Sequence, residues 1–344
     1  MNSNSKVIFR ADGNAEIGLG HITRSLALAE MLKDHFDCHF ATRFISESVR
    51  KDILNICREL IELPNDNHEG YFLDQLAGRE IVVLDNYFFS FDFQHSIKDK
   101  GCGLVVIDDL HNREFYADAI INHAPLVSKY SYRAMSDTKF YLGLDYVLLR
   151  KPFLQYDNSA RTIRSINSVF LCLGGADVND YTGEIFATLT NIQQIKNINI
   201  VIGDAYAHEK ELREKLKTSG HQNTIIHSDL GAEEMIEIMT SSDMAIVPAS
   251  SILFEAIKIG MPVLSGYYID NQFDIYNGFL ELNAIYGAGD FGKRPDYSYL
   301  INNLINTVDI QMILLRQKEL FENNSATNLL GVFKSLTYES SDIS

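Results

Sequence analysis

Cysteine is scarce and scattered in this sequence. The four cysteines, Cys38, Cys57, Cys102 and Cys172, form no Cys-x-x-Cys pair, which argues against both a zinc ribbon and a disulfide scaffold. Long apolar runs are also missing, since none reaches the roughly 18 residues that a membrane-spanning helix needs. Residues 1–6 are polar and lead directly into a strand-like run, so we expect no signal peptide. These absences predict a cytoplasmic protein without stable membrane association.

Positive charge is in deficit. The 344 residues include 30 Lys and Arg against 46 Asp and Glu, a formal net charge of −16. Such a surface repels polyanions, so nucleic acid and anionic membranes are not expected as partners. At about 100–200 residues per domain, the length predicts two domains with separate cores. The oligomeric state stays open.

Three motifs for cofactors and metals are absent. Gly13, Gly18 and Gly20 do not make the Gly-x-Gly-x-x-Gly fingerprint of dinucleotide-binding domains. The segment Gly292-Lys293-Arg294 lacks the Ser or Thr that ends a P-loop. No Asp-x-Asp triplet occurs, although many metal-dependent nucleotide-sugar transferases carry one. We therefore expect no NAD, no other cofactor and no metal ion.

Short apolar runs of strand length recur along the chain, with turn residues after them. They lie at residues 7–9, 39–41, 81–84 and 104–107, and again at 169–173, 198–202, 224–226, 244–247 and 262–264. Helical patterns lie between them, such as the face formed by Ile22, Leu26 and Ala29. Strands without alternation, separated by helices, indicate parallel sheets buried on both faces.

This pattern pauses near residues 155–167, which we interpret as a linker. We therefore predict two doubly wound α/β domains, one over residues 1–155 and one over 166–335, followed by a polar tail at 336–344. Both halves begin with a strand that runs into glycines. Because open α/β sheets bind ligands at the carboxyl ends of their strands, a ligand cleft between the two domains is expected.

The segment Gly18-Leu19-Gly20-His21 stands immediately before the first predicted helix. Its glycines allow close approach of a ligand, and the helix start offers N–H groups and a positive dipole end. That end disfavours a protonated imidazole, which suits His21 as a general base. Asp12 or Asp85 would orient the imidazole. The alternative is a histidine that only caps the helix or packs against it.

A second candidate segment runs from Pro248 to Ala256. Ser250 and Ser251 stand at a helix start, and Glu255 follows about one turn later. Diphosphate oxygens would accept from the two hydroxyls and the helix N–H groups, and Glu255 would hold ribose hydroxyls. The alternative is an ordinary serine N-cap with a favourably placed glutamate.

Further polar residues follow predicted strands. Asp85 and Tyr87 come after one strand, and Asp108 and Asp109 come after the next. Adjacent residues of an extended chain point in opposite directions, so we expect one of the two aspartates to face the site and the other to form the loop. Tyr87 is either a substrate contact or a half-buried aromatic.

These motifs together resemble a known family. Arg10-x-Asp12, Gly18-x-Gly20-His21-x-x-Arg24, Gly174-Gly175-x-Asp177, Ala249-Ser250-Ser251 with Glu255, and Asn271-Gln272 are similar in order and spacing to the pseudaminic-acid pathway hydrolases. Members of that family remove UDP from UDP-2,4-diacetamido-2,4,6-trideoxy-β-L-altropyranose. They are related to the MurG-like glycosyltransferases. The resemblance runs from about Val7 to Gly289.

The resemblance implies a GT-B architecture, in which two Rossmann-like domains face across a cleft, and a metal-independent hydrolysis in nonulosonic acid biosynthesis. Direct displacement of UDP by water predicts inversion at the anomeric centre. The resemblance assigns the catalytic base to His21, with Asp12, Asp85 and Tyr87 as further active-site groups. The implied substrate contacts are Arg10, Gly18, Gly20, Arg24, Gly174, Gly175, Ser250, Ser251, Glu255, Asn271 and Gln272.

Two other functions stay open on the sequence. A MurG-like transferase would use the same base to activate an acceptor hydroxyl instead of water. A non-catalytic protein that binds nucleotide sugars would keep the serine-containing helix start without needing Gly18-x-Gly20-His21. A UDP-sugar is the expected partner in all three cases.

Overall fold

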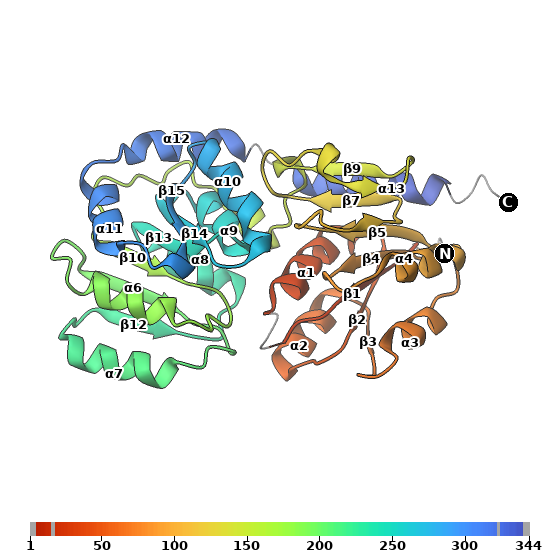
Figure 1. Ribbon diagram of the computed structural model, residues 1–344, viewed down its shortest axis with the longest axis horizontal. Helices are drawn as coiled ribbons and strands as arrows, with labels where there is room; N and C mark the ends of the chain where they lie inside the picture. Colours follow the sequence, from red (N-terminus) through yellow and green to blue (C-terminus); the bar gives the residue numbers. More distant parts are fainter. Residues whose placement is uncertain (1–4, 15–17, 322–323, 340–344) are drawn as a thin grey trace. The chain divides into compact units, whose positions relative to one another are not determined.

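The computed structural model describes residues 5–14, 18–321 and 324–339, and the chain divides into two compact units (Figure 1). The first unit comprises Met1–Lys151 and Asn323–Ser344, and the second comprises Pro152–Glu322. Each unit is built around a sheet of parallel strands, which confirms the predicted α/β class.

The first unit contains a seven-stranded sheet in the order β3-β2-β1-β4-β5-β7-β9, and every pairing is parallel. Its strands are β1 (Lys6–Ala11), β2 (Asp37–Thr42), β3 (Glu59–Glu62), β4 (Ile81–Asp85), β5 (Gly103–Ile107), β7 (Ala119–Asn122) and β9 (Lys139–Leu142). A small separate sheet pairs β6 (Glu114–Phe115) with β8 (Arg133–Ala134). The helices are α1 (Gly20–Leu32), α2 (Glu47–Ile56), α3 (His68–Asp74), α4 (Phe91–Asp99) and α13 (Ser325–Glu339).

Both faces of this sheet are covered by helices (Figure 1). Alternate residues of β1 separate the two cores, since Val7 and Phe9 pack with residues of α1, α2 and α13, whereas Ile8 packs with residues of α3 and α4. The strand period of two residues produces this division. The sheet is therefore buried on both sides, as its continuous apolar strands predict.

The last helix, α13, belongs to the first unit, and this corrects the predicted domain boundary at residue 335. Leu329, Val332 and Phe333 of α13 are buried in the same core as Phe9 and Leu28, and α13 contacts α1. The chain leaves the second unit after residue 322 and returns to the first. The helix therefore joins the first unit although it follows the second unit in the sequence, because its apolar face is buried beside α1.

The second unit repeats the arrangement with a six-stranded sheet in the order β12-β11-β10-β13-β14-β15. Its strands are β10 (Ser168–Leu171), β11 (Asn197–Val201), β12 (Thr224–His227), β13 (Met244–Pro248), β14 (Val263–Tyr267) and β15 (Tyr286–Asp290). Its helices are α6 (Tyr181–Leu189), α7 (Glu209–Ser219), α8 (Ala232–Thr240), α9 (Ser251–Ile259), α10 (Phe273–Glu281), α11 (Tyr297–Asn306) and α12 (Ile310–Leu320), and α5 (Lys151–Gln155) lies at the boundary of the units. Among the helices of the described ranges, none is both long and apolar enough to cross a bilayer.

Both sheets begin with the 3-2-1-4-5 order of Rossmann-like folds. In this order the second and third strands lie on one side of the first strand, and the fourth and fifth lie on its other side. The order therefore reverses between β1 and β4 in the first unit and between β10 and β13 in the second. Such a switch point leaves a crevice at the carboxyl ends of the strands, where ligands bind. The segments that follow these four strands contain most of the predicted site residues.

All four cysteines are buried free thiols. Burial raises the pKa of Cys38 to about 12 and that of Cys102 to about 11. Both side chains therefore stay protonated near neutral pH and pack as small apolar groups.

The position of α13 leads to a stability prediction. Phe333 is fully buried and its ring contacts that of Phe36 at a centroid distance of 6.1 Å. We expect Phe333→Ala to lower the free energy of unfolding of the first unit by about 3–5 kcal/mol, because it leaves a cavity in the core. Urea unfolding monitored by circular dichroism measures this loss.

The exposed Lys334 on the same helix offers a matched control. Lys334→Ala should change the free energy of unfolding by no more than about 0.5 kcal/mol. Equal stability of the two variants would contradict the assignment of α13 to the core of the first unit.

Candidate active site

His21 lies in the first turn of α1, at the carboxyl edge of the sheet of the first unit. Gly18 precedes it with a φ of +73°, a left-handed conformation that favours glycine, and its N–H donates to the carbonyl of Asn14 at 2.8 Å. A Cβ added at Gly18 or Gly20 would meet no atom within 4 Å in the described structure. The segment is therefore an open turn that delivers His21 to the start of the helix.

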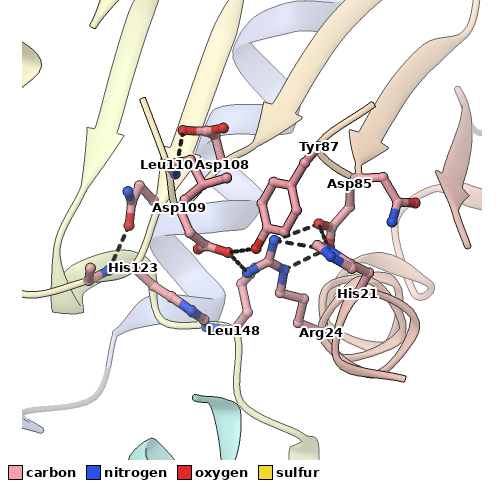
Figure 2. Close-up of polar contacts among 12 residues, drawn as sticks. His21, Arg24, Asp85, Tyr87, Asp108, Asp109, Leu110, His123 and Leu148 are labelled. Carbon is pink, nitrogen blue, oxygen red and sulfur yellow. Dashed lines mark hydrogen bonds and ion pairs between the residues drawn. The ribbon is translucent and has the colours of Figure 1, made fainter. Parts of the chain in front are cut away.

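Asp85, the last residue of β4, holds the imidazole of His21 (Figure 2). Nδ1 of His21 lies 2.7 Å from Oδ1 of Asp85, and both side chains are buried. A carboxylate accepts, so Nδ1 carries the proton and the neutral imidazole keeps its lone pair on Nε2. Of the two aspartates considered from the sequence, Asp85 contacts the imidazole, and Asp12 is bonded elsewhere.

Arg24 lies one helical turn after His21 and joins two carboxylates. Its Nε and Nη2 donate to Oδ2 and Oδ1 of Asp85 at 2.8 and 2.6 Å, and its Nη1 donates to Oδ2 of Asp109 at 2.5 Å. The hydroxyl of Ser25 also donates to Asp85, at 3.0 Å. Although the resemblance implied a substrate contact for Arg24, this guanidinium is buried between two protein carboxylates.

The adjacent aspartates after β5 take different roles, as the sequence analysis expected. Oδ2 of Asp108 accepts from the backbone N–H groups of Leu110 and His111 at 3.0 and 2.6 Å and so shapes the loop. Asp109 turns the other way and accepts from Arg24 (Figure 2). Asp109 thereby joins the cluster around His21.

Tyr87, like Arg24, lies next to both Asp109 and the imidazole of His21. Its hydroxyl donates to Oδ2 of Asp109 at 2.7 Å, and its ring lies edge-on to the ring of His21 with centroids 4.7 Å apart. The imidazole is thus held at Nδ1 by a charged hydrogen bond and packed by an aromatic ring. These contacts restrict its rotation, which a positioned base requires.

The electrostatics of this cluster keep both carboxylates ionised. Burial alone would raise the pKa of Asp85, but the charge of Arg24 and the hydrogen bonds from Arg24 and His21 hold the pKa well below its usual range. Arg24 and Tyr87 likewise outweigh burial and lower the pKa of Asp109. Two buried negative charges therefore surround one guanidinium.

Arg10 and Asp12 form a separate buried network. Nη1 and Nη2 of Arg10 donate to the two oxygens of Asp12 at 2.6 and 2.9 Å, and Arg43 donates to the same carboxylate through its backbone N–H and Nε, both at 2.8 Å. Oδ1 of Asn86 accepts from the N–H of Asp12 at 2.6 Å. Arg10 is fully buried, so the structure places this predicted substrate contact inside the protein, where it and Arg43 bond the same carboxylate of Asp12.

The second unit brings its predicted residues to the ends of β10, β13 and β14. Ser250 and Ser251 stand at the start of α9, where the first N–H groups lack intrahelical acceptors, and Glu255 is buried one turn further on. Gly174 follows β10 with a φ of +93°. Gly175 lies against the backbone of Gly203, since a Cβ added to Gly203 would lie 2.5 Å from the Cα of Gly175. Glycine at positions 174 and 203 thus allows neighbouring segments to pack closely at this edge.

Asn271 and Gln272 lie in a short 3₁₀ turn after β14. Gln272 is buried, and its Oε1 accepts from the N–H of Tyr268 at 3.0 Å. The Tyr268 hydroxyl in turn donates to the carbonyl of Leu173 at 2.8 Å. Gln272 therefore holds the segment beside Gly174, while Asn271 is half-buried at the same edge.

His123 and Arg43 contribute to these networks but were missed by the sequence analysis. His123 follows β7, a strand that the analysis did not predict, so the histidine gave no signal of its own. Within the described ranges, no three His, Cys, Asp or Glu side chains are arranged to hold a metal ion.

Solved glycosyltransferase structures share this fold. MurG of Acinetobacter baumannii matches with a TM-score of 0.65 at 12% identity, covering 96% of this chain and 99% of its own. A UDP-glucosyltransferase of Polygonum tinctorium matches with a TM-score of 0.68 at 13% identity, covering 98% and 100%. The chain therefore has a GT-B fold.

Sequence comparison finds distant relatives. The UDP-2,4-diacetamido-2,4,6-trideoxy-β-L-altropyranose hydrolase of Campylobacter jejuni is 27% identical over 272 residues, which cover 78% of this chain and 93% of the hydrolase. The spore coat polysaccharide biosynthesis protein SpsG of Bacillus subtilis is 23% identical over 312 residues, which cover 88% and 90%. The chain is a distant homologue of both.

An uncharacterized protein of Methanocaldococcus jannaschii is 25% identical over 286 residues. These cover 80% of this chain but 58% of that protein, so the chain spans little more than half the length of this relative. No protein-family model matches the chain.

The burial of His123 leads to a prediction of pH-dependent stability. Burial lowers the pKa of His123 to about 4, and Nδ1 of its neutral ring accepts from the N–H of Leu148 at 3.3 Å. The unfolded chain binds this proton near pH 6.5, so the stabilisation is complete above that pH and is lost as pH falls toward 4. About 2 kcal/mol should be lost between pH 7 and pH 5.

Urea unfolding at both pH values tests this in wild type and His123→Gln, which should lack that part of the pH dependence. The half-exposed His95 provides the control, since His95→Gln should keep the wild-type slope. An unchanged slope in His123→Gln would show that His123 is not buried in its neutral form.

Proposed function

We propose that this chain hydrolyses a UDP-linked 2,4-diacetamido-2,4,6-trideoxy sugar to UDP and the free sugar. The observation that carries the proposal is the pairing of His21 with Asp85, because it leaves Nε2 of a buried, oriented imidazole as a proton acceptor. The distant homology to the C. jejuni hydrolase supports the substrate class. The GT-B fold, which this chain shares with UDP-sugar transferases, supports a nucleotide-sugar ligand.

In the proposed reaction His21 activates water. Nε2 takes one proton as the water oxygen bonds to the anomeric carbon, and the bond from that carbon to the diphosphate oxygen breaks with its electron pair leaving on UDP. Asp85 stabilises the imidazolium through Nδ1. Attack opposite to the leaving group inverts the anomeric centre.

The proposal assigns the diphosphate to the start of α9 in the second unit. The N–H groups at this helix start and the hydroxyls of Ser250 and Ser251 provide donors for the charge that grows on the leaving group. Glu255 would accept from ribose hydroxyls. Binding and proton transfer thus depend on different units of the chain.

The test of this function is release of UDP without an acceptor. A panel of UDP-linked 2,4-diacetamido sugars, with UDP-N-acetylglucosamine for comparison, should give UDP and free sugar from one diacetamido donor, also in the presence of EDTA. Strict dependence on an added acceptor would favour a MurG-like transferase instead. Tight UDP binding without turnover of any donor would indicate a non-catalytic binding protein.

A substitution separates proton transfer from binding. We expect His21→Gln to lower turnover by about 10²–10⁴-fold, because general-base catalysis contributes that much. The Kd of UDP, measured by calorimetry, should change less than about twofold, because UDP is assigned to the second unit.

His35, exposed beyond the other end of α1, offers the control. His35→Gln should retain wild-type turnover. Near wild-type turnover of His21→Gln would remove His21 from the mechanism.

A further inference from the structure

We propose that Asp109 is a positioning residue that sets the charge around His21, acting through Arg24 and Tyr87. This inference rests on the proposed role of His21 as the base. Asp109 itself does not contact the imidazole through any hydrogen bond among the described residues. Its effect would pass through the two side chains that touch both Asp109 and His21.

The positive charge of Arg24 opposes protonation of His21 unless a second carboxylate lies nearby. Nη2 of Arg24 lies 3.3 Å from Nδ1 of His21 while it donates to Oδ1 of Asp85 at 2.6 Å. The base must therefore become an imidazolium directly beside a guanidinium. Asp85 alone would have its charge offset by Arg24, and protonation of His21 would then be opposed by a neighbouring cation.

Asp109 restores the missing negative charge. It binds the remaining nitrogen of Arg24, Nη1, so the guanidinium lies between two carboxylates. The charges of Asp85, Arg24 and Asp109 together leave one net negative charge for the imidazolium to neutralise. Proton uptake by His21 then takes the cluster from one negative charge to none.

The other charged groups that face the cluster do not alter this count. Burial keeps His123 neutral, and Tyr87 is a neutral donor. Asp108 and Arg113 lie 3.4 Å apart and offset each other. The balance therefore depends on Asp85, Arg24 and Asp109.

An independent observation argues that the charge of Asp109 matters. Its Oδ1 is buried and has no hydrogen-bond partner in the part of the chain that the structure describes. Burying a carboxylate with an unsatisfied oxygen is costly, and an amide at this position could still accept from Arg24 and Tyr87 at lower cost. A purely structural partner for Arg24 would not need the negative charge.

Asp109→Asn tests the inference because it keeps the shape and one acceptor oxygen while removing the charge. Without that charge His21 is harder to protonate, so the acid limb of the kcat–pH profile for UDP release should move about one pH unit lower. The plateau of kcat should fall by about 3- to 10-fold, because a weaker base transfers the proton less readily. KM should change less than about twofold.

Glu80→Gln is the matched control, since it removes a buried carboxylate that lies at the opposite end of β4 from Asp85 and accepts from the backbone N–H groups of residues 77–79. Its acid limb should stay at the wild-type pH, even if loss of the loop hydrogen bonds lowers its stability. A structural role for Asp109 would reduce the amount of folded enzyme without moving the profile.

A second measurement does not depend on turnover. The second measurement uses ¹⁵N-histidine-labelled protein without substrate, in which the NMR signal of His21 is the one that His21→Gln abolishes. This signal should titrate about one pH unit lower in Asp109→Asn and at the wild-type pH in Glu80→Gln. An unmoved His21 titration in folded Asp109→Asn overturns the inference. A shifted titration in a protein that hydrolyses no donor would support the charge balance and refute the proposed function.

Discussion

Arg24 is shared by two buried carboxylates at the ends of neighbouring strands, and the geometry around His21 depends on this ion pair network. Removing charges from water costs several kcal/mol per ion, and the cost is offset only where the hydrogen bonds are well formed. Here three guanidinium nitrogens bond carboxylate oxygens at 2.5–2.8 Å. Because Asp85 also holds Nδ1 of His21, the position of the imidazole is tied to the same network.

The network exists because α1 runs from the carboxyl edge of the sheet, where His21 and Arg24 occupy its first two turns. Asp85 ends β4 and Asp109 follows β5, and these strands are adjacent and parallel, so their ends meet at one edge. Tyr87 follows β4 in the next loop and closes the cluster. This edge of the sheet thus assembles five side chains that come from three separate segments.

The two units share a strand order but differ in the polar groups at their edges. The first presents a buried cluster of charges around a histidine, whereas the second presents glycines and a helix start with two serines. These groups suit proton transfer and anion binding respectively. The chain is a distant homologue of a sugar-nucleotide hydrolase and has the GT-B fold.

Much of the fold follows from local sequence. Apolar runs and glycine-containing turns were sufficient to predict nine strands, two doubly wound halves and the helix start at His21, since these signals depend on neighbouring residues. Strand β3 was missed because it lies at the edge of the sheet and is half-exposed, and β15 was missed because glycines occupy two of its five positions. The sequence also predicted that Asp108 and Asp109 would diverge, because alternation is a local property.

Tertiary structure alone decided which of these residues meet. Arg24 lies 61 residues from Asp85 and 85 residues from Asp109 along the chain, and no local pattern links them. The choice of Asp85 over Asp12 as the partner of His21, and the return of α13 to the first unit, likewise depend on strand order and core packing. The sequence by itself determined most of the elements and the polar groups at their ends. The contacts that hold the imidazole of His21 arise only when the sheet brings those ends together.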